Sequence, residues 1–167
     1  NENARAEEQV RRLALKELLL GCWRRETEPD ETQWPTRRSY KLIFNNSLLG
    51  DLPPLNVRLE HVTLLELMGD GNHKRVGEFL RAFPNLISLT VERHALQRIP
   101  ERVFDLNHLQ HLKLNENSIH LTPDSIEQLS RLTNLTHLDL SDNPLTLSPA
   151  LRNLPRLVLV SLHNCGL

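Results

Sequence analysis

The sequence predicts an α/β solenoid, an arc with a short-stranded parallel sheet on its concave face and helices or loops on its convex face. Three observations indicate this. Leucines recur at fixed offsets in five successive segments, a polar or cysteine residue follows at one further offset, and the segments begin 22 to 26 residues apart. Because one such segment cannot bury its own apolar side chains, neighbouring segments must stack.

The repeat follows the template Leu-x-x-Leu-x-Leu-x-x-Asn/Cys-x-Leu, which is the pattern of a leucine-rich repeat. Copies begin at residues 62, 86, 109, 135 and 157, the last of them truncated, and residues 40–61 form a degenerate first coil. The ninth position can hydrogen-bond backbone groups of neighbouring coils, so we expect a structural ladder there. Its members are Asp70, His94, Asn117, Asn143 and Cys165.

The segments that lead from one strand to the next differ in length. Residues 74–83 carry apolar residues at helical spacing, which predicts a helix. In the longest copy Thr122 is suited to cap a helix that begins at Pro123. The shorter segments around Pro100 and Pro149 predict a loop or a single helical turn.

Residues 1–39 are set apart from the repeats, which occupy residues 40–167. Their first part predicts an amphipathic α-helix, and the following polar stretch, with Pro29 and Pro35, predicts a linker. The helix has two interpretations. It caps the exposed end of the array, or it binds a partner by itself.

Composition excludes several classes of function. The net charge is −1 and basic residues are not clustered with aromatic ones, so we expect no nucleic-acid partner. No apolar run reaches the roughly 18 residues of a membrane span. Cys22 and Cys165 are too few for a disulfide framework, and neither has a base at a spacing that would make it a nucleophile. We therefore expect no catalytic residue, cofactor or metal in this segment, and a monomer.

Side chains that alternate with the buried leucines should form the concave face, the usual binding surface of a solenoid. Equal offsets place Leu64, Ser88, His111, His137 and Leu159 in one column, and a second column runs from Glu66 to Ser161. The acidic residues of this face outnumber the basic ones, which indicates a protein partner with a basic patch. The alternative is a merely solvated surface without a partner. The candidate partner-binding residues are Glu66, Met68, Thr90, Glu92, Arg93, His111, Lys113, Glu116, His137, Asp139, Asp142 and His163.

His111 and His137 are neighbours in the first column, with Asp139 nearby. Two histidines without a fixed third ligand are more typical of hydrogen-bonding surface groups than of a metal site. A pH-sensitive contact is their more plausible functional use.

Three short stretches add a resemblance to a family. The strings Leu20-Gly21-Cys22-Trp23-Arg24-Arg25, Leu49-Gly50-Asp51-Leu52-Pro53 and Phe83-Pro84-Asn85-Leu86 resemble the repeat region of large pseudomonad effector-like proteins with a NEL-type E3 ubiquitin ligase domain, related to IpaH-type effectors. The resemblance implies secretion by a bacterium, action in the host cytoplasm, and a segment that selects the substrate and restrains the ligase. The family's catalytic cysteine lies in a Cys-x-Asp motif after the repeats, which neither cysteine here matches.

The sequence thus supports two functions. The first is the substrate-recognition segment of a secreted bacterial E3 ubiquitin ligase. The second is a non-enzymatic intracellular leucine-rich repeat scaffold that binds a signalling protein. An extracellular receptor is disfavoured because its repeats usually carry cysteine-rich caps. The sequence following Leu167 would distinguish the first two.

Overall fold

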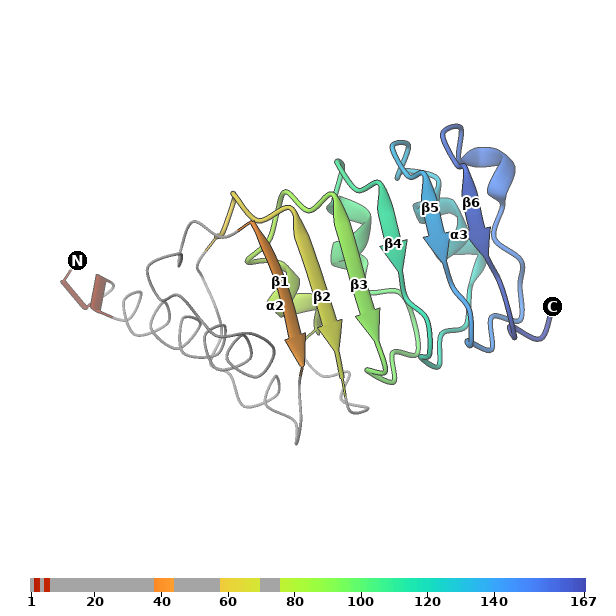
Figure 1. Cartoon of the computed structure of the whole chain (residues 1–167), viewed down its shortest axis with the longest axis horizontal. Helices are drawn as coiled ribbons and strands as arrows, with labels where there is room; N and C mark the ends of the chain where they lie inside the picture. Colours follow the sequence, from red (N-terminus) through yellow and green to blue (C-terminus); the bar gives the residue numbers. More distant parts are fainter. Residues whose placement is uncertain (1, 4, 7–37, 44–57, 70–75) are drawn as a thin grey trace.

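The computed structural model describes residues 2–3, 5–6, 38–43, 58–69 and 76–167. Within them six strands form one parallel sheet in chain order, open at both ends (Figure 1). The strands are β1 (Ser39–Ile43), β2 (Leu64–Met68), β3 (Ser88–Glu92), β4 (His111–Lys113), β5 (His137–Asp139) and β6 (Leu159–Ser161). The predicted leucine-rich repeat sheet is therefore confirmed.

Side chains on the strands alternate between the core and the opposite face. Leu65 and Leu67 of β2 are fully buried, whereas the residues between and beside them are half-buried. The same alternation places Leu112 and Leu138 in register, and both are fully buried. One continuous apolar core therefore runs along the array, as stacking of individually unstable coils requires.

The return segments lie behind the sheet in Figure 1. They contain α2 (Val76–Leu80), the 3-10 turn η3 (Glu101–Asp105), α3 (Pro123–Leu129) and a second 3-10 turn, η4 (Leu151–Asn153). Helices thus form in the two segments where the sequence predicts them, and single turns form in the two shorter ones. Helix α2 ends at Leu80, three residues before the predicted boundary, and residues 74–75 lie outside the described part.

Helix α3 begins as its capping residues dictate. The Thr122 hydroxyl accepts a hydrogen bond from the backbone N–H of Ser125 at 3.1 Å, and the Ser125 hydroxyl accepts one from the N–H of Thr122 at 2.8 Å. This reciprocal pair satisfies two donors that the first helical turn leaves without partners. Pro123 has no N–H to satisfy at the first helical position.

After each strand from β3 to β6 a left-handed residue turns the chain just before the ladder position. Arg93, Glu116, Asp142 and Asn164 have φ of 60°, 55°, 59° and 55°, and each directly precedes a ladder position. The strands end earlier, at Glu92, Lys113, Asp139 and Ser161. The expectation that Arg93, Glu116, Asp142 and His163 lie on strands is therefore wrong, because these residues form the turn that redirects the chain.

The ladder side chains connect successive coils. The amide nitrogen of Asn117 donates to the carbonyls of Val91 and Leu114, both at 2.9 Å, and its oxygen accepts from the N–H of His94 at 3.0 Å. Asn117 therefore holds the turn of its own coil and the turn of the preceding coil together.

Asn143 repeats this arrangement one coil later, and Cys165 repeats part of it. Asn143 donates to the carbonyls of Leu114 and Leu140 and accepts from the N–H of Ile119 at 3.0 Å. The Cys165 thiol donates to the carbonyl of Leu140 at 3.1 Å. The carbonyls of Leu114 and Leu140 thus each accept from their own coil and from the next one. Asp70 lies outside the described residues.

His94 occupies the ladder position of its coil and is fully buried. Its ring lies against Gly69, where an added Cβ would come within 2.6 Å of Nε2. Gly69 is therefore required by the close approach of an imidazole that replaces the smaller asparagine side chain.

We expect Gly69→Ala to lower the free energy of unfolding by about 1–3 kcal/mol, because the buried His94 ring cannot move aside without strain. Gly77→Ala is the control. Gly77 lies in helix α2, where a Cβ would meet its nearest atom at 4.0 Å, and alanine should raise stability by about 0.5–1 kcal/mol. Urea denaturation measures both, and equal effects of the two substitutions would contradict the packing described for Gly69.

The predicted N-terminal cap and linker fall almost entirely outside the described residues. Of residues 1–39 the structure describes residues 2–3 and 5–6, which are helical, and residues 38–39. Strand β1 begins at Ser39, one residue before the position at which the sequence analysis starts the repeats. The division of the chain at residue 40 stays a prediction. No helix among the described residues has the length and apolar character to cross a membrane.

Candidate protein-binding face

The face of the sheet opposite the helices is defined here as the open face. The strand register places Leu64, Ser88, His111, His137 and Leu159 in one row across it. A second row consists of Lys41, Glu66, Thr90, Lys113, Asp139 and Ser161. Both rows match the columns expected from the sequence, since each strand keeps the same offset from its buried leucines. The sequence analysis did not include Lys41.

One candidate in the second row is not accessible. Thr90 is only 8% exposed, between the longer side chains of Glu66 and Lys113 on the adjacent strands. Thr90 therefore offers little surface to a partner, and its contact with one stays a prediction. Met68 and Glu66 are half-buried, and Lys113 is exposed.

The charge of the open face is more balanced than the sequence suggested. Lys41 is in register with Glu66, and Lys113 is in register with Asp139. The second row therefore alternates in sign along the array. Adjacent opposite charges at equal offsets favour a partner surface that itself carries both signs.

At the turn after β3 and β4, two carboxylates surround one arginine. Arg93 Nε donates to Glu116 Oε2 at 2.7 Å, and its Nη2 lies 3.7 Å from Glu92 Oε1. Glu92 is the least exposed of the three, at 14% of its side chain, against 65% for Arg93. Arg93 is thus an ion-pair partner for two of the candidate acidic residues.

Burial and neighbouring charge separate the two carboxyls. Partial burial raises the pKa of Glu92 above its ordinary 4.5, and the hydrogen bond and negative charge of Glu116 raise it further. The hydrogen bond with Glu92, followed by that with Arg93, lowers the pKa of Glu116 below 4.5. At neutral pH, ionisation of Glu92 therefore opposes folding, whereas ionisation of Glu116 favours it.

We expect Glu92→Gln and Glu116→Gln to shift the urea midpoint at pH 7 in opposite directions, upward for Glu92→Gln and downward for Glu116→Gln. The effect of Glu92→Gln on the midpoint should shrink as the pH falls below the raised pKa of the folded chain. It should vanish below 4.5, where the Glu92 carboxyl is protonated in the folded and the unfolded chain alike. The Glu116 difference should persist to lower pH, until its lowered folded pKa is passed. Glu127→Gln on α3 is the control, and parallel pH profiles for all three variants would contradict the cluster.

Asp139, at the end of β5, and Asp142, in the turn that follows it, already have hydrogen-bond partners. Asp139 Oδ1 accepts from the backbone N–H of Ser141 at 2.9 Å, and Asp142 Oδ1 accepts from Asn164 Nδ2 at 3.0 Å. These bonds fix the direction of both carboxylates. His163, also a candidate, is exposed nearby in the chain.

The rings of His111 and His137 meet edge to face with centroids 4.5 Å apart. The Thr136 hydroxyl donates to the carbonyl of Gln110 at 3.1 Å and lies 2.8 Å from His137 Nδ1. These two contacts of the Thr136 hydroxyl fix the orientation of the His137 ring on the sheet.

The histidine pair has no third metal-ligating side chain placed beside it in the described part of the chain. Within the described ranges no group of three or more His, Cys, Asp or Glu side chains is placed to hold a metal ion. The pair is therefore a polar and aromatic element at the centre of the open face.

A second set of cross-coil contacts was missed in the sequence. Asn85 Nδ2 donates to the carbonyl of Glu60, and Asn134 Nδ2 donates to that of Asn107, both at 2.9 Å. Each asparagine directly precedes the first leucine of a repeat, so a recurring Asn-Leu pair was the available signal. These bonds lie where the chain enters its strands, at the edge opposite the ladder.

Comparisons with known proteins agree with this geometry. The leucine rich repeat family matches residues 84–145. The chain is 35% identical over 99 residues, 58% of its length, to the volume-regulated anion channel subunit LRRC8D of Rattus norvegicus. It is 31% identical over 110 residues, 62% of its length, to the disease resistance protein RFL1 of Arabidopsis thaliana. The chain therefore contains a leucine-rich repeat.

These similarities concern a small part of each relative. The chain spans 12% of the length of the channel subunit and 12% of the disease resistance protein. Both relatives are eukaryotic proteins. The bacterial ligase origin expected from the three short stretches is therefore not shown by these similarities. The shared feature is a repeat of a kind that generally binds protein partners.

Proposed function

We propose that this chain binds a partner protein through the open face of its sheet. One observation carries the proposal. The described helices lie on one side of the six-stranded sheet (Figure 1), and ordered rows of mainly polar side chains occupy the other. A rigid surface of this kind loses little conformational entropy when it binds a partner.

The central contact in this proposal is formed by His111, His137 and Lys113. The two rings are fixed against each other, and Lys113 is the exposed cation between Thr90 and Asp139. The alternating charges of the second row set the register of the partner, and Asp139 and Asp142 at the β5 end take up its basic residues. The chain acts in this binding as a monomer.

The test is affinity capture with the chain as bait, followed by quantification of each captured protein. The variant His111→Ala/Lys113→Glu should reduce capture of the partner at least tenfold without altering the circular dichroism spectrum. Arg131→Glu, in the turn after α3 on the other side of the sheet, is the matched control and should capture as the native chain does. Equal capture by the native chain and the double variant would place the binding surface elsewhere.

We propose further that the chain is the substrate-recognition segment of a secreted bacterial E3 ubiquitin ligase that acts in the host cytoplasm. The three flanking strings described above support this. The parent protein, with ubiquitin-activating and ubiquitin-conjugating enzymes, should assemble ubiquitin chains, and deletion of the repeats should abolish modification of the captured partner. Failure of both the parent and its repeat-deleted form to assemble chains would exclude the ligase assignment and leave the binding proposal intact.

The similarity to a channel subunit and to a plant disease resistance protein favours a second candidate, a non-enzymatic scaffold that binds a signalling protein. A scaffold needs the open face but no ubiquitin transfer. In the same assay its partner would be captured and would remain unmodified.

A further inference from the structure

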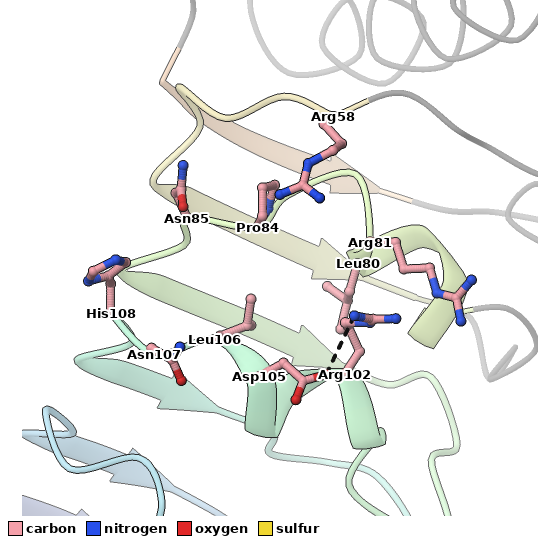
Figure 2. Close-up of a pocket in the computed structure, with 10 residues that line it drawn as sticks. All are labelled: Arg58, Leu80, Arg81, Pro84, Asn85, Arg102, Asp105, Leu106, Asn107 and His108. Carbon is pink, nitrogen blue, oxygen red and sulfur yellow. Dashed lines mark ion pairs between the residues drawn. The ribbon is translucent and has the colours of Figure 1, made fainter. Parts of the chain in front are cut away.

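A pocket of about 300 Å³ lies at the edge of the array where the chain enters β3 and β4. Three stretches of chain line it: Arg58, residues 80–85 and residues 102–108 (Figure 2). It is separate from the open face, since the strands' exposed side chains do not contribute to it. Its volume is at the lower end of the range typical of small-ligand sites.

Arginine side chains dominate the pocket. Arg58, Arg81 and Arg102 come from three successive segments and lie on one side of the pocket in Figure 2, with Asn85 and His108 on the other. Asp105 is the single carboxylate among the lining residues. The lining therefore carries an excess of positive charge, on a chain whose net charge is −1.

The ion pairs leave much of this charge available. Arg102 Nη1 lies 3.4 Å from Asp105, and Arg58 Nε lies 3.5 Å from Glu60, whose side chain is 67% exposed. In the described part of the chain Arg81 has no carboxylate within 4 Å and is exposed. Exposed pairs of this kind contribute little to stability, so an anion that offers better geometry can displace them.

The rest of the pocket is held in place by the fold. Leu80 and Leu106 belong to the buried core, at 0% and 2% exposure. The Asn85 amide is fixed by its bond to the Glu60 carbonyl, and the Asn107 carbonyl accepts from Asn134. The arginines thus extend from a rigid base that spans three coils.

We propose that this arginine pocket binds a phosphate group. Guanidinium groups bind tetrahedral oxyanions through pairs of parallel N–H donors, and the three lining arginines supply such donors with enough positive charge for a phosphate monoester. A volume of about 300 Å³ also has room for the group that carries the phosphate. The bound phosphate group belongs either to free inorganic phosphate or to a phosphorylated amino acid, and the experiment below distinguishes the two. The proposal does not depend on the open face.

The experiment is isothermal titration calorimetry at low ionic strength with inorganic phosphate, O-phosphoserine and O-phosphotyrosine, and with unmodified serine as a negative probe. We expect saturable binding of at least one phosphate compound that weakens with added salt. Tighter binding of a phosphoamino acid than of inorganic phosphate identifies the carried group as part of the ligand, and the reverse order identifies the free anion.

Three variants locate the site. Arg81→Ala removes a lining arginine without breaking an ion pair in the described part and should weaken binding about tenfold or more. Asp105→Asn removes the competing carboxylate and should strengthen binding. Arg131→Ala, the equivalent exposed residue after α3, should leave it within twofold.

Absence of saturable binding by every phosphate compound would overturn the proposal. So would equal weakening by Arg81→Ala and Arg131→Ala, because that result indicates general charge attraction. Weaker binding by Asp105→Asn would also contradict it, since this residue would then hold the ligand and not compete with it.

Discussion

Leu138→Ala should lower the free energy of unfolding by about 2–5 kcal/mol. Leu138 is fully buried at the middle of β5, in register with Leu112 on one side and Val160 on the other. Truncation leaves a cavity that those strands cannot close without losing their own packing. Because each coil is stabilised by its neighbours, the loss is transmitted to the adjacent repeats.

Urea denaturation followed by circular dichroism measures this effect. Val158→Ala is the control, because Val158 is 79% exposed and its truncation should change stability by no more than about 0.5 kcal/mol. A loss below about 1 kcal/mol for Leu138→Ala would show that Leu138 does not face the common core.

Asn143→Ala should cost about 2–4 kcal/mol, which makes it the largest expected effect of removing a polar side chain. Asn143 is 1% exposed, and its oxygen is the acceptor for the backbone N–H of Ile119. Alanine leaves that buried donor without a partner and removes the bonds to the carbonyls of Leu114 and Leu140. Two coils lose a shared contact at once.

Asn143→Asp tests the same site with nearly unchanged volume. A carboxylate cannot donate to the two carbonyls, and its charge would be buried against them. The aspartate variant should therefore be less stable at pH 7 than at pH 4, whereas the alanine variant should show no such dependence. Asn153→Ala, an exposed asparagine in η4, is the control. Equal stability of native chain and Asn143→Ala would contradict the ladder.

Much of the architecture follows from the spacing of a few residues. The two apolar positions of each repeat fix which side chains face the core, because side chains on a strand alternate with a period of two residues. The rows containing His111 and His137 could therefore be predicted from sequence alone. The Thr122-Pro123 pair likewise determines where α3 begins, since capping depends on residues close together in the chain.

The properties of individual side chains on the open face could not be predicted in this way. Thr90 has the correct offset but is covered, because its accessibility depends on the length of side chains contributed by β2 and β4. Arg93 counts as a free cation in the sequence, whereas in the fold it pairs with Glu116 from the next coil. Both outcomes depend on residues more than 20 positions away.

The amino-acid sequence by itself determined the repeat, the strand register and the ladder positions, because each of these depends on local periodicity and on the hydrogen-bonding capacity of single residues. The tertiary structure alone decided how His94 packs on Gly69 and how Arg58, Arg81 and Arg102 come to share one pocket. The physical reason is that the return segments differ in length and conformation. The relative positions of side chains on different coils therefore depend on how those segments pack. The spacing of residues within one coil does not predict these positions.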